Sequence, residues 1–385
     1  MELIRCRAAL IVLAGALVGA SIDASQAPVA PQAAATKSGN QERLARIRAE
    51  LFAGTNRPDD AVRELKEILA VDPGSAEVHM LLGIAYRTVG APDLMGEAIA
   101  EFRQALALDP SSVPARYFLA HIYFELGRNE RAREELDAAL ALAPRSPQFL
   151  ALLGEVERQL KNPTRSLEVL TQALQIDATS AQAHYYLGLT LLDLGQTDEA
   201  IKELEGVVRS GEKRADVYVS LGASYLDAGR FDEGLQALTT AGQIDPLRPD
   251  IQIQLARAYR LKGQLLKADA QLMKGMPKGP ANVASPFAQQ RQVEFNLYME
   301  LGLLRLQQGQ LTAAVSAFRK VLEIDPDHGP TNRQLAEVFL RQGQYSRALE
   351  YAGRAEKLGF PLPDDKRKLL QAQLQKQKKE AGAQK

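Results

Sequence analysis

Side chains that could carry out chemistry are few and scattered along this sequence. The chain has four histidines and a single cysteine, Cys6. Acid–base catalysis, nucleophilic catalysis and zinc binding each need such groups at characteristic spacings. No H-E-x-x-H, G-x-S-x-G, P-loop or G-x-G-x-x-G pattern occurs. We therefore predict no catalytic residue, no cofactor, no metal site and no enzymatic activity.

The histidines and acidic pairs fit a structural role better than a catalytic one. His79 and His184 stand at equivalent points of two similar segments, where we expect them to pack at the edge of a core. His328 follows an Asp-Pro-Asp turn and is expected to be solvated. The neighbouring carboxylates Glu134 and Glu135 are expected to face solvent on a helix. These predictions require helices at regular intervals along the chain.

Composition favours a helical, soluble chain of balanced charge. The 385 residues are 46% hydrophobic and 24% charged, with a formal net charge of zero and no tryptophan. Strands draw on β-branched and aromatic residues, whereas Ala and Leu dominate here. A dedicated nucleic-acid binder would carry a basic excess. The expected partners therefore exclude nucleic acid.

The N-terminal residues differ from the rest of the chain. Arg5 and Arg7 precede an uninterrupted apolar run over residues 8–20. A membrane-spanning helix needs roughly 20 such residues, so the run is more typical of a secretory signal. We predict a signal peptide at 1–20, with an uncleaved anchor as the alternative, and a flexible Ala/Pro/Gln-rich linker at 21–40. Export to the periplasm or the exterior follows.

The remaining sequence repeats itself. The string LLGIAY (81–86) returns as YLGLTL (186–191), SLGASY (220–225) and ELGLLR (300–305). Aligned on these strings, the units begin near Glu42, Ala76, Val113, Pro147, Ala181, Ala215, Pro249, Phe295 and Gly329. Six of the eight intervals between these starts are 34 residues, and the other two are 37 and 46. Such a period indicates stacked supersecondary units, each too small to bury its apolar face alone.

The units resemble the tetratricopeptide repeat over about residues 42–360. That family expects a small residue at the eighth position of each unit, and the chain has Gly83, Ala120, Gly154, Gly188, Gly222, Ala256, Gly302 and Ala336 there. An aromatic is expected three positions later, and the chain has Phe52, Tyr86, Tyr123, Tyr225, Tyr259 and Phe339. The resemblance implies an all-α fold, a right-handed superhelical solenoid of about nine helix-turn-helix units.

The long interval divides the predicted array. Units one to seven are expected at 42–280, an inserted loop at 281–294, and units eight and nine at 295–362. A capping helix with a basic tail is expected at 363–385, because a solenoid must cover its last open edge.

By this resemblance, the first helices line a concave groove, mainly through their second, fifth, ninth and twelfth positions. The candidate peptide-binding residues are Met80, Ile84, Arg87, Tyr117, His121, Phe124, Tyr185, Leu189, Arg257 and Arg260. The aromatic side chains would anchor a peptide, and the arginines would orient its acidic groups. The alternative is that superhelical curvature buries these residues between adjacent first helices.

The resemblance implies a protein-binding scaffold or adaptor, and the predicted signal peptide implies that it acts in the bacterial periplasm or cell envelope. A second hypothesis is a component of exopolysaccharide or envelope-assembly and secretion machinery that contacts carbohydrate. A third makes the array the recognition arm of a separate enzyme. The sequence leaves all three open, together with the oligomeric state.

Overall fold

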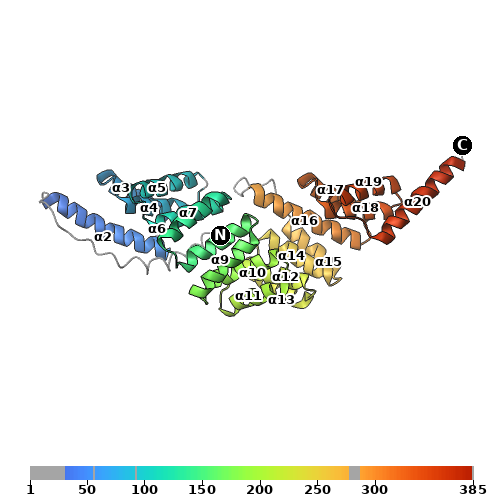
Figure 1. Ribbon diagram of the computed structural model, residues 1–385, viewed down its shortest axis with the longest axis horizontal. Coiled ribbons are helices and arrows are strands. Elements are labelled where there is room, and N and C mark those ends of the chain that lie inside the picture. The colour runs from blue at the N-terminus through green and yellow to red at the C-terminus, as the bar shows by residue number, and fades with distance from the viewer. Residues whose placement is uncertain (1–30, 55–56, 92, 277–286, 384–385) are drawn as a thin grey trace. The chain divides into compact units, whose positions relative to one another are not determined.

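The computed structural model describes residues 31–54, 57–91, 93–276 and 287–383, and over these ranges the chain folds into nineteen helices (Figure 1). The described residues contain no strand. The predicted signal peptide and Cys6 lie outside the described residues. Contacts divide the chain into two compact parts, with the boundary in the sequence between Ser210 and Gly211.

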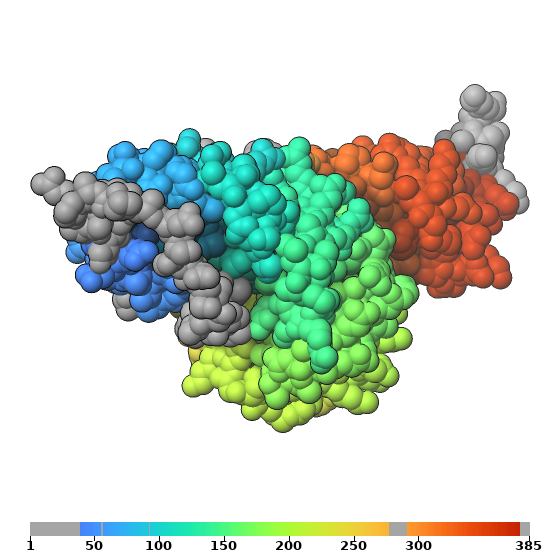
Figure 2. All heavy atoms as spheres, turned by 60° about the vertical axis from the view of Figure 1, so that its left-hand side comes forward, coloured from blue at the N-terminus to red at the C-terminus, as the bar shows by residue number. Residues whose placement is uncertain are grey.

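The N-terminal part consists of helices paired into hairpins. Its helices are α2 (Pro31–Ala53), α3 (Pro58–Val71), α4 (Ala76–Val89), α5 (Leu94–Leu108), α6 (Val113–Glu125), α7 (Asn129–Leu142), α8 (Pro147–Gln159), α9 (Pro163–Ile176), α10 (Ala181–Asp193) and α11 (Thr197–Arg209). From α4 on, each first helix packs most extensively on the second helix that follows it. In the space-filling view, the side chains of successive hairpins in this part form a continuous surface (Figure 2).

The C-terminal part repeats the same plan. Its helices are α12 (Ala215–Asp227), α13 (Phe231–Ile244), α14 (Pro249–Leu261), α15 (Leu265–Gly275), α16 (Phe287–Gln307), α17 (Leu311–Ile324), α18 (Gly329–Arg341), α19 (Tyr345–Lys357) and α20 (Asp364–Ala383). The last helix, α20, packs on α19, and its Leu370 is buried in the apolar cluster of this end of the chain. The described residues thus form nine hairpins and a terminal helix, which confirms the predicted helical solenoid.

Small residues let the two helices of a hairpin approach closely. A Cβ atom built on Gly154 would lie 2.4 Å from Cγ of Leu170, and one built on Gly302 would lie 2.5 Å from Cε1 of Phe318. Such distances leave no room for a side chain, so glycine fixes the spacing of the axes despite its cost of about 1 kcal/mol in a helix. Other glycines end first helices: Gly195 has a φ of 75°, in the left-handed region.

Two predicted irregular segments are partly helical. α2 begins at Pro31, so residues 31–40 of the expected linker form a helix. α16 begins at Phe287, so residues 287–294 of the expected loop extend the first helix of the next hairpin. Both stretches are rich in Ala, Gln or Glu, which are good helix formers. In the second, Arg291 donates to the carbonyl oxygen of Ile324 at 3.0 Å and so satisfies the end of α17.

Candidate functional site

In each of the two parts, the surface built by the first helices, here called the first-helix face, is the predicted partner-binding site. Its members are α4, α6, α8 and α10 in the N-terminal part and α12, α14, α16 and α18 in the C-terminal part. Neighbouring first helices contact one another directly, as do α4 with α6, α6 with α8 and α8 with α10. This contact decides which predicted residues a partner could reach.

Four predicted apolar contacts are buried. They are Met80, Ile84, Tyr117 and Tyr185. Tyr117 is only 1% exposed, and its ring stacks on Phe149 of the next first helix with centroids 4.8 Å apart. The prediction that these four side chains touch a peptide is corrected, because their burial leaves them little surface to offer. For Tyr117, the contact that buries it comes from the adjacent first helix, as the alternative interpretation proposed.

Three other predicted residues remain partly exposed on this face. They are His121, Phe124 and Leu189. The ring of Phe124 lies edge-on to the His121 ring with centroids 6.5 Å apart. Phe124 therefore keeps the properties of a candidate anchor, with a rigid ring held by a neighbour.

A charged cluster joins α4 to α6. The buried guanidinium of Arg87 donates from Nη2 to Oε1 of Glu125 at 2.8 Å and to Nδ1 of His121 at 3.1 Å. Burial and the charge of Arg87 lower the pKa of His121. Burial acts to raise the pKa of Glu125, but contact with His121 and the charge of Arg87 outweigh it and lower this pKa to about 2.

A second cluster joins α8 to α10. Arg158 donates from Nε and Nη2 to the two carboxylate oxygens of buried Glu155, each at 2.8 Å, and from Nη1 to Asp193 at 2.9 Å. Gln159 donates a further hydrogen bond to Glu155 at 2.8 Å. Burial acts to lower the pKa of Arg158, and its bonds to Glu155 outweigh that effect and raise it.

The predicted arginines of the C-terminal part are also paired. Arg257 pairs with Asp227 of α12, and Arg260 donates to Glu300 of α16 at 2.8 Å. The prediction that the arginines are free to orient acidic partner groups is therefore corrected, since Arg87, Arg257 and Arg260 each have a carboxylate partner. Sequence reasoning missed these carboxylates, although a signal exists: Glu125, Asp193 and Asp227 all stand at the thirteenth position of their units.

The histidines at the fourth position of two units, His79 and His184, each connect their hairpin to the turn before it. His184 contacts Glu203 of its second helix through Nδ1 at 2.6 Å, and the carbonyl oxygen of Ala178 through Nε2 at 3.0 Å. His79 makes the same two kinds of contact. Arg116 takes their place in the third unit and donates to Glu135 at 3.0 Å. These histidines are structural, and Glu135 is paired where solvation was expected.

His328 also departs from the prediction. Its ring is half-buried, edge-on to Phe295 with centroids 5.0 Å apart, and its Nδ1 accepts from the backbone N–H of Thr331 at the start of α18. Burial lowers its pKa. The ring that was expected to be solvated is covered on one side by Phe295 of α16.

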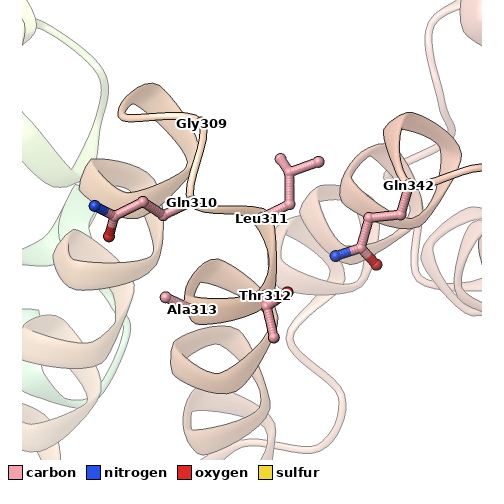
Figure 3. A pocket seen from close by; sticks show the side chains of 6 residues that line it. All are labelled: Gly309, Gln310, Leu311, Thr312, Ala313 and Gln342. Atoms are coloured by element: carbon pink, nitrogen blue, oxygen red, sulfur yellow. The ribbon is translucent and has the colours of Figure 1, made fainter.

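Two depressions of the described surface lie at hairpin turns. One is lined by Gly309, Gln310, Leu311, Thr312, Ala313 and Gln342, with Gln342 facing the α16–α17 turn from the next hairpin (Figure 3). Within the described ranges, no group of three or more His, Cys, Asp or Glu side chains could hold a metal ion. No described helix is both long and apolar enough to cross a membrane.

Family models described as tetratricopeptide repeat match residues 48–113, 95–156, 131–271 and 305–359. These matches cover most of the chain and fall on the hairpins. The chain belongs to the tetratricopeptide repeat family. The helices that carry the matches in this tetratricopeptide repeat protein are those of the first-helix face and their second-helix partners.

Known proteins similar to this tetratricopeptide repeat protein cover it to different extents. The Cut9–Hcn1 heterotetramer of the APC/C gives a TM-score of 0.60 at 14% identity over 81% of this chain and 58% of that chain, which shows the fold. PilW, described as a type IV pilus biogenesis factor, gives a TM-score of 0.49 at 20% identity over 54% and 96% of the two chains. The CTR9 homolog of Arabidopsis thaliana is 41% identical over 61 residues, which are 16% of this chain and 6% of that protein.

Proposed function

We propose that this protein is an exported interaction scaffold that binds peptide segments of other proteins along its first-helix face, in the periplasm or cell envelope. Export is supported by Arg5, Arg7 and the apolar run at 8–20. The scaffold role is supported by the family and the fold. In this proposal the protein contributes binding and no chemistry of its own.

One observation decides what kind of peptide fits. In three ion pairs of the first-helix face the arginine is more buried than its carboxylate. The exposed fractions of the side chains are 7% and 29% for Arg87 and Glu125, 17% and 43% for Arg158 and Asp193, and 26% and 54% for Arg257 and Asp227. At these three pairs the face offers carboxylate oxygens to a partner and withholds the guanidinium groups. A peptide with basic side chains matches it, which reverses the acidic partner suggested by the sequence.

An apolar side chain of the same peptide would contact Phe124. This ring lies on α6 next to the cluster of Arg87, His121 and Glu125, and it is partly exposed. Aromatic rings supply contact area at low entropic cost. An extended peptide with an apolar residue near Phe124 and basic residues near Asp193 is the ligand that the N-terminal part supports.

The alternative function, contact with carbohydrate in exopolysaccharide machinery, lacks support from the tyrosines of the predicted groove. Exopolysaccharide binding would use exposed tyrosines with Asn, Asp and Gln nearby. Tyr117 and Tyr185, the two tyrosines among the predicted groove residues, are buried. A place in envelope-assembly machinery through protein contacts is compatible with the proposal.

Photocrosslinking in fractionated cells tests the proposal. A photoreactive phenylalanine analogue replaces Phe124, and the matched control replaces Glu134, an exposed residue of α7. We expect a specific adduct only from position 124, in the exported fraction. In the chain that carries the analogue at position 124, the additional substitution Asp193→Asn should reduce the yield of the adduct. The substitution Glu168→Gln, at an exposed position of α9, should leave that yield unchanged. Equal labelling from both sites would refute the binding face, and a cytosolic protein would refute export.

A further inference from the structure

One second helix, α15, exposes apolar side chains where the other second helices are polar or small. Leu266 is 86% exposed and Met273 is 66% exposed, and Ala270 between them is exposed as well. At the position of Leu266, the units from the third on carry Glu130, Thr164, Asp198, Asp232, Thr312 and Ser346. At the position of Met273 they carry Asp137, Thr171, Glu205, Thr239, Arg319 and Gly353. The difference is confined to one hairpin.

These side chains form a stripe along one side of α15. Leu266, Ala270 and Met273 follow at spacings of four and three, so they lie on one helix face. The opposite face is buried through Ala268 and Leu272. The stripe continues into exposed Met276. From Leu266 to Met276 it is about 15 Å long at 1.5 Å per residue.

The same end of the hairpin carries another exposed leucine. A Cβ atom built on Gly275 would lie 3.4 Å from the carbonyl oxygen of Pro249, so the end of α15 meets the start of α14. Leu247, two residues before Pro249, is 89% exposed. The apolar surface therefore extends from α15 toward the α13–α14 turn.

The charges beside the stripe are positive. Lys267 and Lys274 of α15 are exposed, and Lys267 lies with its Nζ 5.5 Å from the centre of the Tyr259 ring. The acidic residue of α15, Asp269, is already bonded to Arg305 at 2.8 Å. The stripe thus presents apolar side chains with cations along its edge.

We propose that the α15 stripe (Leu266, Ala270, Met273 and Met276) binds an amphipathic helix of a partner protein, with apolar residues at spacings of three and four and with carboxylates beside them. The apolar residues pack on the stripe and the carboxylates pair with Lys267 and Lys274. This site is separate from the first-helix face, and it does not depend on the function proposed for that face.

The charges of α13, the second helix before α15, favour a partner helix over a membrane surface as the ligand of the stripe. α13 exposes Asp232 and Glu233, and Lys262 of the α14–α15 turn pairs with Asp232. An anionic lipid surface laid over α15 would also meet these carboxylates, which it repels. A single helix covers a stripe one helix wide and leaves α13 in water.

A synthetic peptide tests the proposal with the full chain. The probe is a fluorescent helix of about 14 residues, with Leu at helical spacings of three and four and Glu elsewhere, and its anisotropy is followed as protein is added. The double variant Leu266→Asp, Met273→Glu places on α15 the residue types that α13 and α11 carry at these positions. We expect it to bind at least about tenfold more weakly than the natural chain, a loss of about 1.4 kcal/mol. The matched control Thr239→Glu, at the position of Met273 on α13, should bind like the natural chain.

Three results would overturn the proposal. The first is equal binding of the peptide by the natural chain and the double variant, and the second is equal binding of a peptide with Lys in place of Glu. The third is a different occupant. Vesicles of phosphatidylcholine and phosphatidylglycerol that retain the natural chain but not the double variant would assign the stripe to a membrane. A dimer in sedimentation velocity that the double variant abolishes would assign it to a second copy.

Discussion

The first-helix face and the outward face of α15 contain similar apolar residues in opposite surroundings. Tyr117 on α6 is 1% exposed because adjacent first helices and its own second helix surround it, whereas Leu266 on α15 is 86% exposed. Buried apolar residues such as Tyr117, which suggested a binding groove, therefore pack inside the array of helices. The apolar residues of α15, which the sequence did not single out, face solvent. Apolar content along a helix therefore locates a partner surface only after the neighbouring helices are known. The contrast predicts large stability effects on the first face and small ones on the second.

The largest expected effect is at Tyr117. Tyr117→Ala removes a buried ring stacked on Phe149 and leaves a cavity between α6 and α8, so it should lower the free energy of unfolding by about 3–5 kcal/mol. Phe124→Ala, on the same helix but partly exposed, should cost about 1 kcal/mol. Urea denaturation followed by circular dichroism measures both. A similar small loss in the two variants would contradict the assignment of Tyr117 to the core.

The next effect separates two glycines that both lie inside helices of the N-terminal part. Gly154→Ala places a methyl group against Leu170 and should destabilise by about 1–3 kcal/mol. Gly206→Ala meets only the far end of the Arg209 side chain at 3.9 Å, and it should stabilise by up to about 1 kcal/mol through helix propensity. Thermal unfolding of the two variants gives shifts of opposite sign. Shifts of the same sign would show that helix spacing does not depend on the eighth position.

A third effect depends on pH at the cluster of the first-helix face. The pKa of Glu125 falls from 4.5 to about 2 on folding, so its stabilisation is complete above pH 4.5 and is lost as the pH falls toward 2. The pKa of His121 is lowered from 6.5, so protonation of this ring also destabilises the fold below that pH. Because the Glu125 side chain is 29% exposed, we expect about 2 kcal/mol from it and not the full value of the shift.

Glu125→Gln provides the comparison for this pH effect. The variant leaves the buried Arg87 without its carboxylate, so it should be less stable at pH 7, yet it should lose less stability on acidification than the natural chain. Glu134→Gln on the exposed side of α7 serves as control and should follow the natural chain. Urea denaturation across the acid range decides the matter. Parallel curves for Glu125→Gln and the natural chain would count against the low pKa.

The sequence predicted the fold because its signals are local to each unit. The period, the small eighth residue such as Gly154, and the turn glycines are all visible within 34 residues. The site was less predictable because its contacts cross units. Arg87 meets Glu125, which is 38 residues further along the chain, and the pairing depends on how adjacent first helices pack. The exposure of Leu266 likewise depends on which helices lie over α15.

The smallest expected effect completes the comparison. Leu266→Asp with Met273→Glu should change the free energy of unfolding by no more than about 0.5 kcal/mol, because exposed side chains away from packed neighbours contribute little. The aspartate introduced at position 266 lies in the first turn of α15, where its charge interacts favourably with the helix dipole. The glutamate introduced at position 273 lies near the end of the helix, where the same interaction is unfavourable. Urea denaturation measures the change beside that of Tyr117→Ala. A loss of several kcal/mol would mean that the stripe is covered within the folded chain, and it would remove the surface from which we infer a partner helix.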